Sequence, residues 1–263
     1  SGTPHRLMEV SSIWLMPQYK TEEKNFFGYE GNMTIRKSDA TQVNISVRSS
    51  VKLRAEHGRM FHFANSCAMK NEKYESAVHI NDIIDELGLS RRADNRKRVV
   101  ELLRGCISAV ITVSSPSRVS MFHLLESMDY NSMTGVVSFR INKDYYEAVK
   151  VFKERYIGIS NVMSLRASNE LAIELNTYLQ IRGSGVDKPA KTISHDDAVL
   201  YLHLLTIADE KSRENLLRRA FKSLESKGLE KYKLMTIDGK KVWTCSPKTK
   251  VAKTFSEIDE FSS

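Results

Sequence analysis

The sequence contains the same order of predicted elements twice, and this repetition constrains the fold more than any other feature. In each half, a helix with an apolar face precedes a short extended segment, a short helix, a turn and a basic helix, and further extended segments follow. The two short extended segments contain Ile80 and Ile193, which are 113 positions apart. This distance is too long for a solenoid repeat and fits two tandem domains.

Local signals mark the elements of the first half. Asn81 is predicted to cap a short helix, and Gly88 is placed to take a positive φ in the turn after it. The predicted elements are a helix over 51–69, an extended segment over 77–80, a helix over 82–87, a basic helix over 91–104, strands over 109–113, 119–125 and 136–141, a turn at 114–117 and a polar break at 129–134.

The second half carries stronger signals. Ser194 and Asp197 resemble a capping box with Asp in place of Glu, and Asp238-Gly239 between two extended runs is a strong hairpin signal. The predicted elements are a helix over 168–181, a loop over 183–189, an extended segment over 192–193, a helix over 195–205, a basic helix over 211–227, and strands over 233–237 and 240–244.

A helix, a short strand, a helix-turn-helix and a β-hairpin in this order describe a winged helix. We therefore expect an α+β fold with two tandem winged-helix domains, each with a small antiparallel hairpin as its wing. The predicted divisions are an N-terminal segment of unclear role over 1–44, a first winged helix over 45–158, a second over 159–250, and a tail over 251–263. Trp14 and Phe26 make the N-terminal segment too apolar for a free tail.

The positive charge is concentrated in the second half. Residues 211–250 contain twelve basic and four acidic residues, so this stretch carries the whole net charge of +8. A second basic cluster lies on the first basic helix. Clustered cations of this kind typically bind a polyanion such as DNA.

The second basic helix has two distinct faces. Its apolar side contains Leu217, Phe221 and Leu224, and Arg213 projects toward this side near the helix start, from where it could still reach a DNA backbone. We expect the opposite face and the hairpin to bind DNA, since arginine can pair with guanine and asparagine with adenine. The predicted DNA-binding residues are Lys211, Arg213, Asn215, Arg218, Arg219 and Lys222 on the helix, and Lys233, Lys240 and Lys241 on the hairpin.

The first basic helix mixes charges of both signs, because Asp94 and Glu101 lie among its cations. Two interpretations stand equal, a helix that clamps the DNA backbone and a solvated surface helix. Arg92 and Arg96 are predicted to lean toward the apolar face. The candidate DNA-binding residues here are Arg91, Arg92, Lys97, Arg98 and Arg104.

Motifs for catalysis, metals and cofactors are missing from the sequence. His62 and His203 each lie between apolar residues without the second histidine that a His-hydrophobic-His metal pair needs, and no GxxxxGK[ST] loop occurs. His195 is followed by two acids that capping explains better than metal binding. The three scattered cysteines and the absence of long apolar runs predict a cytoplasmic protein without disulfides, zinc or a membrane span. We expect no enzymatic activity, no metal and no cofactor.

Over about residues 49–247 the sequence resembles the iteron-binding replication initiator (Rep) proteins of theta-replicating plasmids. The resemblance rests on Ser114 to Arg118 followed by Val136 to Asn142, on Arg166 to Arg182, and on Arg213 with the run Arg218-Arg219-Ala220-Phe221. The segment before Ser38 departs from the family pattern. A chromosomal initiator of the same architecture, or the core of a longer protein, fits the same resemblance.

The resemblance implies a division of labour. The second domain reads most of each direct repeat in origin double-stranded DNA, while the first contacts the adjacent DNA and forms a homodimer. Monomers open the origin and recruit the host replication initiator and the replicative helicase in the bacterial cytoplasm, whereas dimers repress the protein's own gene. Two alternatives stay open, a winged-helix transcription regulator that binds a palindrome and a module that binds only protein.

Overall fold

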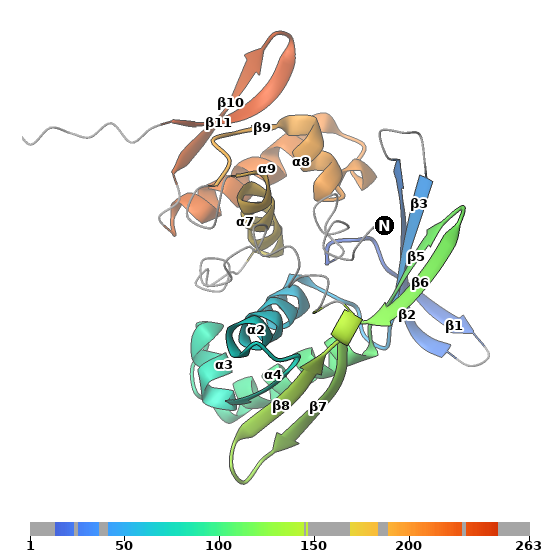
Figure 1. Cartoon of the computed structure of the whole chain (residues 1–263). Helices are drawn as coiled ribbons and strands as arrows, with labels where there is room; N and C mark the ends of the chain where they lie inside the picture. Colours follow the sequence, from blue (N-terminus) through green and yellow to red (C-terminus); the bar gives the residue numbers. More distant parts are fainter. Residues whose placement is uncertain are drawn as a thin grey trace, which may run out of the picture.

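The computed structural model describes two bodies, each with its own hydrophobic core (Figure 1). Helix α2 (Ala55–Asn71) of the first packs against helix α7 (Glu170–Arg182) of the second. The described residues are 14–23, 26–36, 42–144, 146, 169–183, 189–227 and 230–246.

The first body contains a winged helix. Helices α2 and α3 both pack on α4, and β4, β8 and β7 form an antiparallel sheet in that order. The wing is the hairpin of β7 and β8, in which Asn131 pairs with Val136. The elements after α2 are β4 (Glu75–His79), α3 (Ile80–Glu86), α4 (Ala93–Ser108), β7 (Leu125–Asn131) and β8 (Val136–Ile141).

The second body repeats this plan with matching topology. Its sheet has the order β9-β11-β10, which corresponds to β4-β8-β7 of the first. The elements after α7 are β9 (Thr192–Ser194), α8 (His195–Tyr201), the short 3-10 helix η2 (Leu204–Thr206), α9 (Glu210–Glu225), β10 (Lys231–Ile237) and β11 (Lys240–Ser246). The predicted α+β fold with two winged helices is confirmed, whereas the predicted boundary at 158/159 lies outside the described residues.

A second sheet distinguishes the first body. It is antiparallel with the order β1-β2-β3-β5-β6, and it lies beside the helices of the first winged helix in Figure 1. Val43, Ile45 and Val47 alternate along β3 and are buried in the first core. Its strands are β1 (Tyr19–Glu23), β2 (Phe26–Arg36), β3 (Gln42–Ser49), β5 (Val110–Ser115) and β6 (Arg118–His123).

Trp14 and Met16, at the start of the described residues, belong to the first core. Trp14 is buried and its ring lies 6.1 Å from that of Phe61, and a Cβ on Gly58 would come within 2.8 Å of the Trp14 ring. Trp14, one of the residues that made a free tail improbable, thus packs beside α2.

The strand predictions between α4 and β8 were wrong in part. The predicted strand over 119–125 is split between β6 and β7, and the predicted polar break at 129–134 overlaps β7. Strand β7 buries only Leu125 fully, while Met128 and Tyr130 are half-buried. A wing strand with one face in water carries a weak hydropathy signal, and its polar residues resemble a loop.

Most local signals are confirmed, with three corrections. Gly88 has φ 67°, and the side chain of Ser194 accepts a hydrogen bond from the Asp197 N–H. Asn81 is not the N-cap of α3, because the Nδ1 atom of His79 accepts the Asn81 N–H at 3.1 Å. Helix α2 begins at Ala55 rather than at residue 51, and helix α8 ends at Tyr201 rather than at residue 205.

Candidate DNA interface

Helix α9 presents a cationic face because its apolar residues are spaced for burial on one side. Leu217, Phe221 and Leu224 are buried in the second core. Asp209 caps the helix by accepting the Ser212 N–H at 2.7 Å, which satisfies one of the free donors of the first turn.

The structure exposes all but one of the predicted α9 residues. Arg213 is half-buried, and its Nε atom has no hydrogen-bond partner in the part of the chain that the structure describes. The exposed predicted residues are Lys211, Asn215, Arg218, Arg219 and Lys222. The predicted side of the helix is therefore open to a partner, although binding itself stays a prediction.

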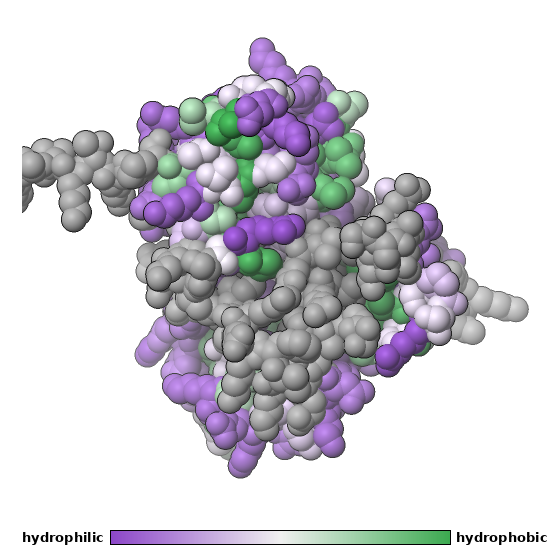
Figure 2. Space-filling model, turned by 45° about the horizontal axis from the view of Figure 1, so that its top comes forward, coloured by the Kyte–Doolittle hydropathy of each residue, from purple (hydrophilic) through white to green (hydrophobic). Residues whose placement is uncertain are grey.

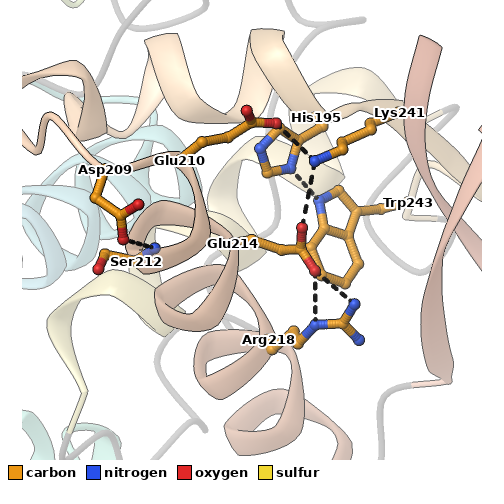
Figure 3. Close-up of polar contacts among 8 residues, drawn as sticks. All are labelled: His195, Asp209, Glu210, Ser212, Glu214, Arg218, Lys241 and Trp243. Atoms are coloured by element: carbon orange, nitrogen blue, oxygen red, sulfur yellow. Dashed lines mark hydrogen bonds and ion pairs between the residues drawn. The ribbon is translucent and has the colours of Figure 1, made fainter. Parts of the chain in front are cut away.

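Two carboxylates of α9 hold two of the predicted cations, Arg218 on the same helix and Lys241 on β11 (Figure 3). Glu214 accepts hydrogen bonds from Arg218 Nε at 3.1 Å and Nη2 at 2.7 Å. The Nζ atom of Lys241 lies 2.6 Å from Glu210 Oε1 and 3.5 Å from Glu214 Oε2. The hydrogen bond from Arg218 lowers the pKa of Glu214, and that from Lys241 lowers the pKa of Glu210.

An aromatic cluster supports this network. The guanidinium carbon of Arg218 lies 5.7 Å from the ring centroid of Trp243, which is within the range of a cation–π contact. The Trp243 ring is 1% exposed and packs 4.6 Å from the Phe221 ring, centroid to centroid. The Arg218 side chain is therefore fixed by a carboxylate and by an aromatic face.

The wing has two different faces. Side chains alternate along a strand, so Lys233, Met235 and Ile237 point away from the core, and Ile237 pairs with Lys240. Lys241 points the other way, toward α9, and is half-buried. The outer face thus combines lysines with exposed apolar side chains. Figure 2 turns the second winged helix forward and shows hydrophilic residues with hydrophobic ones between them.

Acids of the first winged helix hold three of its predicted cations. Arg91 pairs with Asp85 and Arg98 pairs with Glu56, while Arg104 lies 2.7 Å from the carboxylate one turn before it in α4. The pair of Arg98 joins α4 to α2. Exposed surface ion pairs of this kind contribute at most about 1 kcal/mol to stability.

The other cations of α4 make no ion pair with any residue that the structure describes. Arg92, Arg96 and Lys97 are all exposed. The expectation that Arg92 and Arg96 lean toward the apolar face was wrong. Arg92 is the N-cap residue with an extended backbone, and Arg96 is in the first turn of the helix, where both side chains reach solvent.

Sequence reasoning missed the two acids of the network and the role of Trp243. Glu214 lies four residues before Arg218, and this spacing was the signal that could have revealed their ion pair. The contact of Lys241 with α9 depends on the hairpin register and had no local signal.

Two further features of the described residues bear on function. They contain no group of three or more His, Cys, Asp or Glu side chains that could hold a metal ion. No helix among them is both long and apolar enough to cross a membrane.

Comparisons with known proteins agree with this architecture. A comparison with solved structures found domains 2 and 3 of RctB in a selenomethionine crystal structure, with a TM-score of 0.61 and 12% identity over 88% of this chain and 97% of that one. A second crystal structure of RctB domains 2-3 gave a TM-score of 0.59 and 12% identity over 91% of this chain and 96% of that one. At 12% identity, these two matches show that the chain has a similar fold. A search of curated proteins gave no match.

A family comparison identifies the first winged helix. The family described as "Initiator Replication protein, WH1" matches residues 39–180, which include β3, all of the first winged helix and most of α7. This match covers more than half of the chain. The protein therefore belongs to the replication initiator family whose first winged-helix domain this match defines.

Proposed function

We propose that the protein is a sequence-specific double-stranded DNA-binding initiator that binds direct repeats at a plasmid-type origin. The observation that carries this proposal is the exposed cationic face of α9 beside a basic wing, in a chain of the replication initiator family. In a winged helix this arrangement suits a recognition helix in the major groove and a wing on the adjacent backbone or minor groove.

The exposed side chains of the second domain divide by chemistry. Asn215 has a donor and an acceptor and Arg219 has donors to read base edges, and Arg218 can do so from its place on Trp243. Lys211 and Lys222 at the two ends of the face suit phosphates, and the wing adds Lys233 and Lys240. Lys241 contributes through the network that ties the wing to α9, and half-buried Arg213 reaches DNA only after a side-chain movement.

The first domain contacts the adjacent DNA backbone and forms the homodimer. Among its predicted DNA-binding residues, Arg92 and Lys97 are exposed and have no described ion-pair partner, whereas Arg91, Arg98 and Arg104 must exchange a carboxylate for a phosphate. The five-stranded sheet ends at strand β6, whose outer edge pairs with no strand among the described residues and which carries the exposed side chains of Val119 and Met121. A free edge of this kind can pair with a second copy.

The remaining parts of the proposal follow from the family. Monomers on the repeats open the origin and bring in the host replication initiator and the replicative helicase, in the bacterial cytoplasm. Dimers repress the gene of the protein itself. The protein acts by binding alone, so magnesium-dependent nicking of origin DNA by the pure protein would contradict this point.

Selection of bound fragments from random and plasmid-derived DNA, followed by footprinting, tests the proposal. We expect several direct repeats of about two helical turns, each filled by one protomer with both domains on one face of the DNA. A single palindrome bound by a stable dimer would instead indicate a transcription regulator. No enriched sequence, together with DNA binding that varies little with salt, would indicate a module that binds protein.

A further inference from the structure

Glu214 lies between two cations that come from different elements. Its Oε1 atom accepts both hydrogen bonds from Arg218 on α9, and its Oε2 atom faces Lys241 on β11, which Glu210 also holds (Figure 3). Two carboxylates of α9 thus connect the recognition helix to the wing, and Glu214 is the one that also holds Arg218.

The pairing geometry determines which donors of Arg218 are left for DNA. The Nε hydrogen and one Nη2 hydrogen point at Glu214, so the pair of hydrogens at the far end of the guanidinium, one on Nη1 and one on Nη2, is left without a partner among the described residues. That pair matches the two acceptors of guanine, O6 and N7. The contact with Trp243 restricts the plane of the guanidinium, so the side chain is ordered before DNA arrives.

The network is also electrically balanced. Glu210 and Glu214 carry two negative charges that oppose those of Arg218 and Lys241. Neither cation can take a phosphate at full strength while its carboxylate partner stays in place, and the carboxylates themselves repel phosphates. The network therefore opposes binding that depends on charge alone.

We propose that Glu214 is a specificity-determining, positioning residue that presents the outer edge of Arg218 to a guanine, withholds Arg218 from phosphates and, together with Glu210, withholds Lys241 from them. This inference rests on the proposed function of α9 as the DNA reader. Glu214 thus helps the protein to distinguish its site from other DNA, although the negative charge of Glu214 lowers the attraction of α9 for DNA in general.

The test compares Glu214→Ala with the unchanged full chain on two DNA duplexes. One is the site selected by the protein and the other is a scrambled duplex of equal length. We expect the variant to bind the scrambled duplex more tightly, and the ratio of the two affinities to fall at least about fivefold, the lower end for one bidentate base contact. On the scrambled duplex the slope of log affinity against log salt steepens by about one for each released cation.

Two further variants control the interpretation. Glu214→Gln keeps an oxygen that can accept from Arg218 but removes the charge, so it should raise scrambled-DNA affinity while losing less of the ratio. Glu22→Ala removes one negative charge from the exposed pair with Lys20 on β1, and it should leave the ratio unchanged. Thermal melting of each variant shows that the fold is retained, and the Gln variant replaces the Ala variant if the latter does not fold.

The outcomes separate this inference from the proposed function. If the unchanged protein selects a site and Glu214→Ala keeps the same affinity ratio, the inference is wrong while the initiator proposal stands. The inference also fails if the variant binds scrambled DNA more weakly. If the unchanged protein selects no site, the proposed function itself fails.

Discussion

Trp243 donates its indole N–H to Nδ1 of His195 at 3.2 Å in the interior of the second winged helix. Both side chains are almost fully buried, with exposed fractions of 1% and 2%. The bond joins the wing strand β11 to the first residue of α8, and the same indole lies under Arg218. Because a ring nitrogen can accept only when it carries no proton, this contact requires neutral His195.

Acid should therefore destabilise the second domain. Burial has the largest effect on the pKa of His195 and lowers it, and the charge of Lys241 lowers it further, while the carboxylates of Asp196, Glu214 and Glu210 oppose this with smaller effects. The unfolded chain has the higher pKa, near 6.5, so it binds the proton first as the pH falls. The stabilising effect is thus complete above about pH 6.5 and is lost progressively below it.

Urea denaturation between pH 5 and pH 8 measures this effect, with His195→Gln as the comparison. Gln retains an acceptor for the Trp243 N–H and has no titrating group, so the variant should lose less stability in acid than the unchanged protein. His57, whose pKa is also lowered by burial, titrates in both proteins and cancels in the comparison. Equal acid sensitivity of the two proteins would contradict the assignment to His195.

Close packing of α2 on α4 depends on Gly105. A Cβ at this position would lie 2.6 Å from the ring of His57, which is held by a hydrogen bond from the Arg54 N–H. We expect Gly105→Ala to lower the free energy of unfolding by about 2 kcal/mol, because an overpacking cost of about 3 exceeds a helix-propensity gain of about 1. Denaturant unfolding measures the change.

The double variant Gly105→Ala, His57→Asn provides the control. Asn is smaller than His and can still accept the Arg54 N–H, so much of the clash should be relieved. The effect of the Ala substitution should be smaller in the His57→Asn background than alone. Simple addition of the two single effects would mean that the His57 ring is not what opposes the new methyl group.

The second winged helix was largely predictable because its signals are local. The apolar spacing of α9 and the Asp238-Gly239 turn are read within one element, and both turn residues have positive φ, at 49° and 74°. The five-stranded sheet of the first body was not predictable in this way. In it, β3 pairs with β5 between Asn44 and Ser114, with three helices between them in the chain, and no local pattern announces such a contact.

The candidate DNA interface shows the same limit. Exposure followed from helical periodicity, so Lys211, Arg219 and Lys222 were expected on the open face and lie there. Which cations are already paired depends on three-dimensional contacts. Two neighbouring lysines of the wing show this, because Lys240 lies on the outer face while Lys241 forms an ion pair with Glu210 on α9.

Charge on the free edge of β6 should prevent dimer formation if the proposed homodimer uses this edge. Met121 is 69% exposed, and Met121→Lys puts a cation on each copy where the two edges would meet. Sedimentation over a range of concentrations should show a shift toward monomer, while DNA binding on a single repeat is retained. The control is Met133→Lys, at an exposed position in the turn between β7 and β8, and it should leave the dimer unchanged.

Replacing Arg218 and Arg219 together with Ala should abolish sequence preference and leave the fold intact. Both side chains are exposed, and among the described residues the substitution removes the surface ion pair with Glu214 and the contact with Trp243. Lys222→Ala, which removes a cation expected to meet phosphate, should instead weaken binding to selected and scrambled DNA by a similar factor. Titration of both duplexes at two salt concentrations separates the two effects. Sequence-specific binding that survives the double substitution would mean that another element reads the DNA, and the cations of α4 would be the next to test.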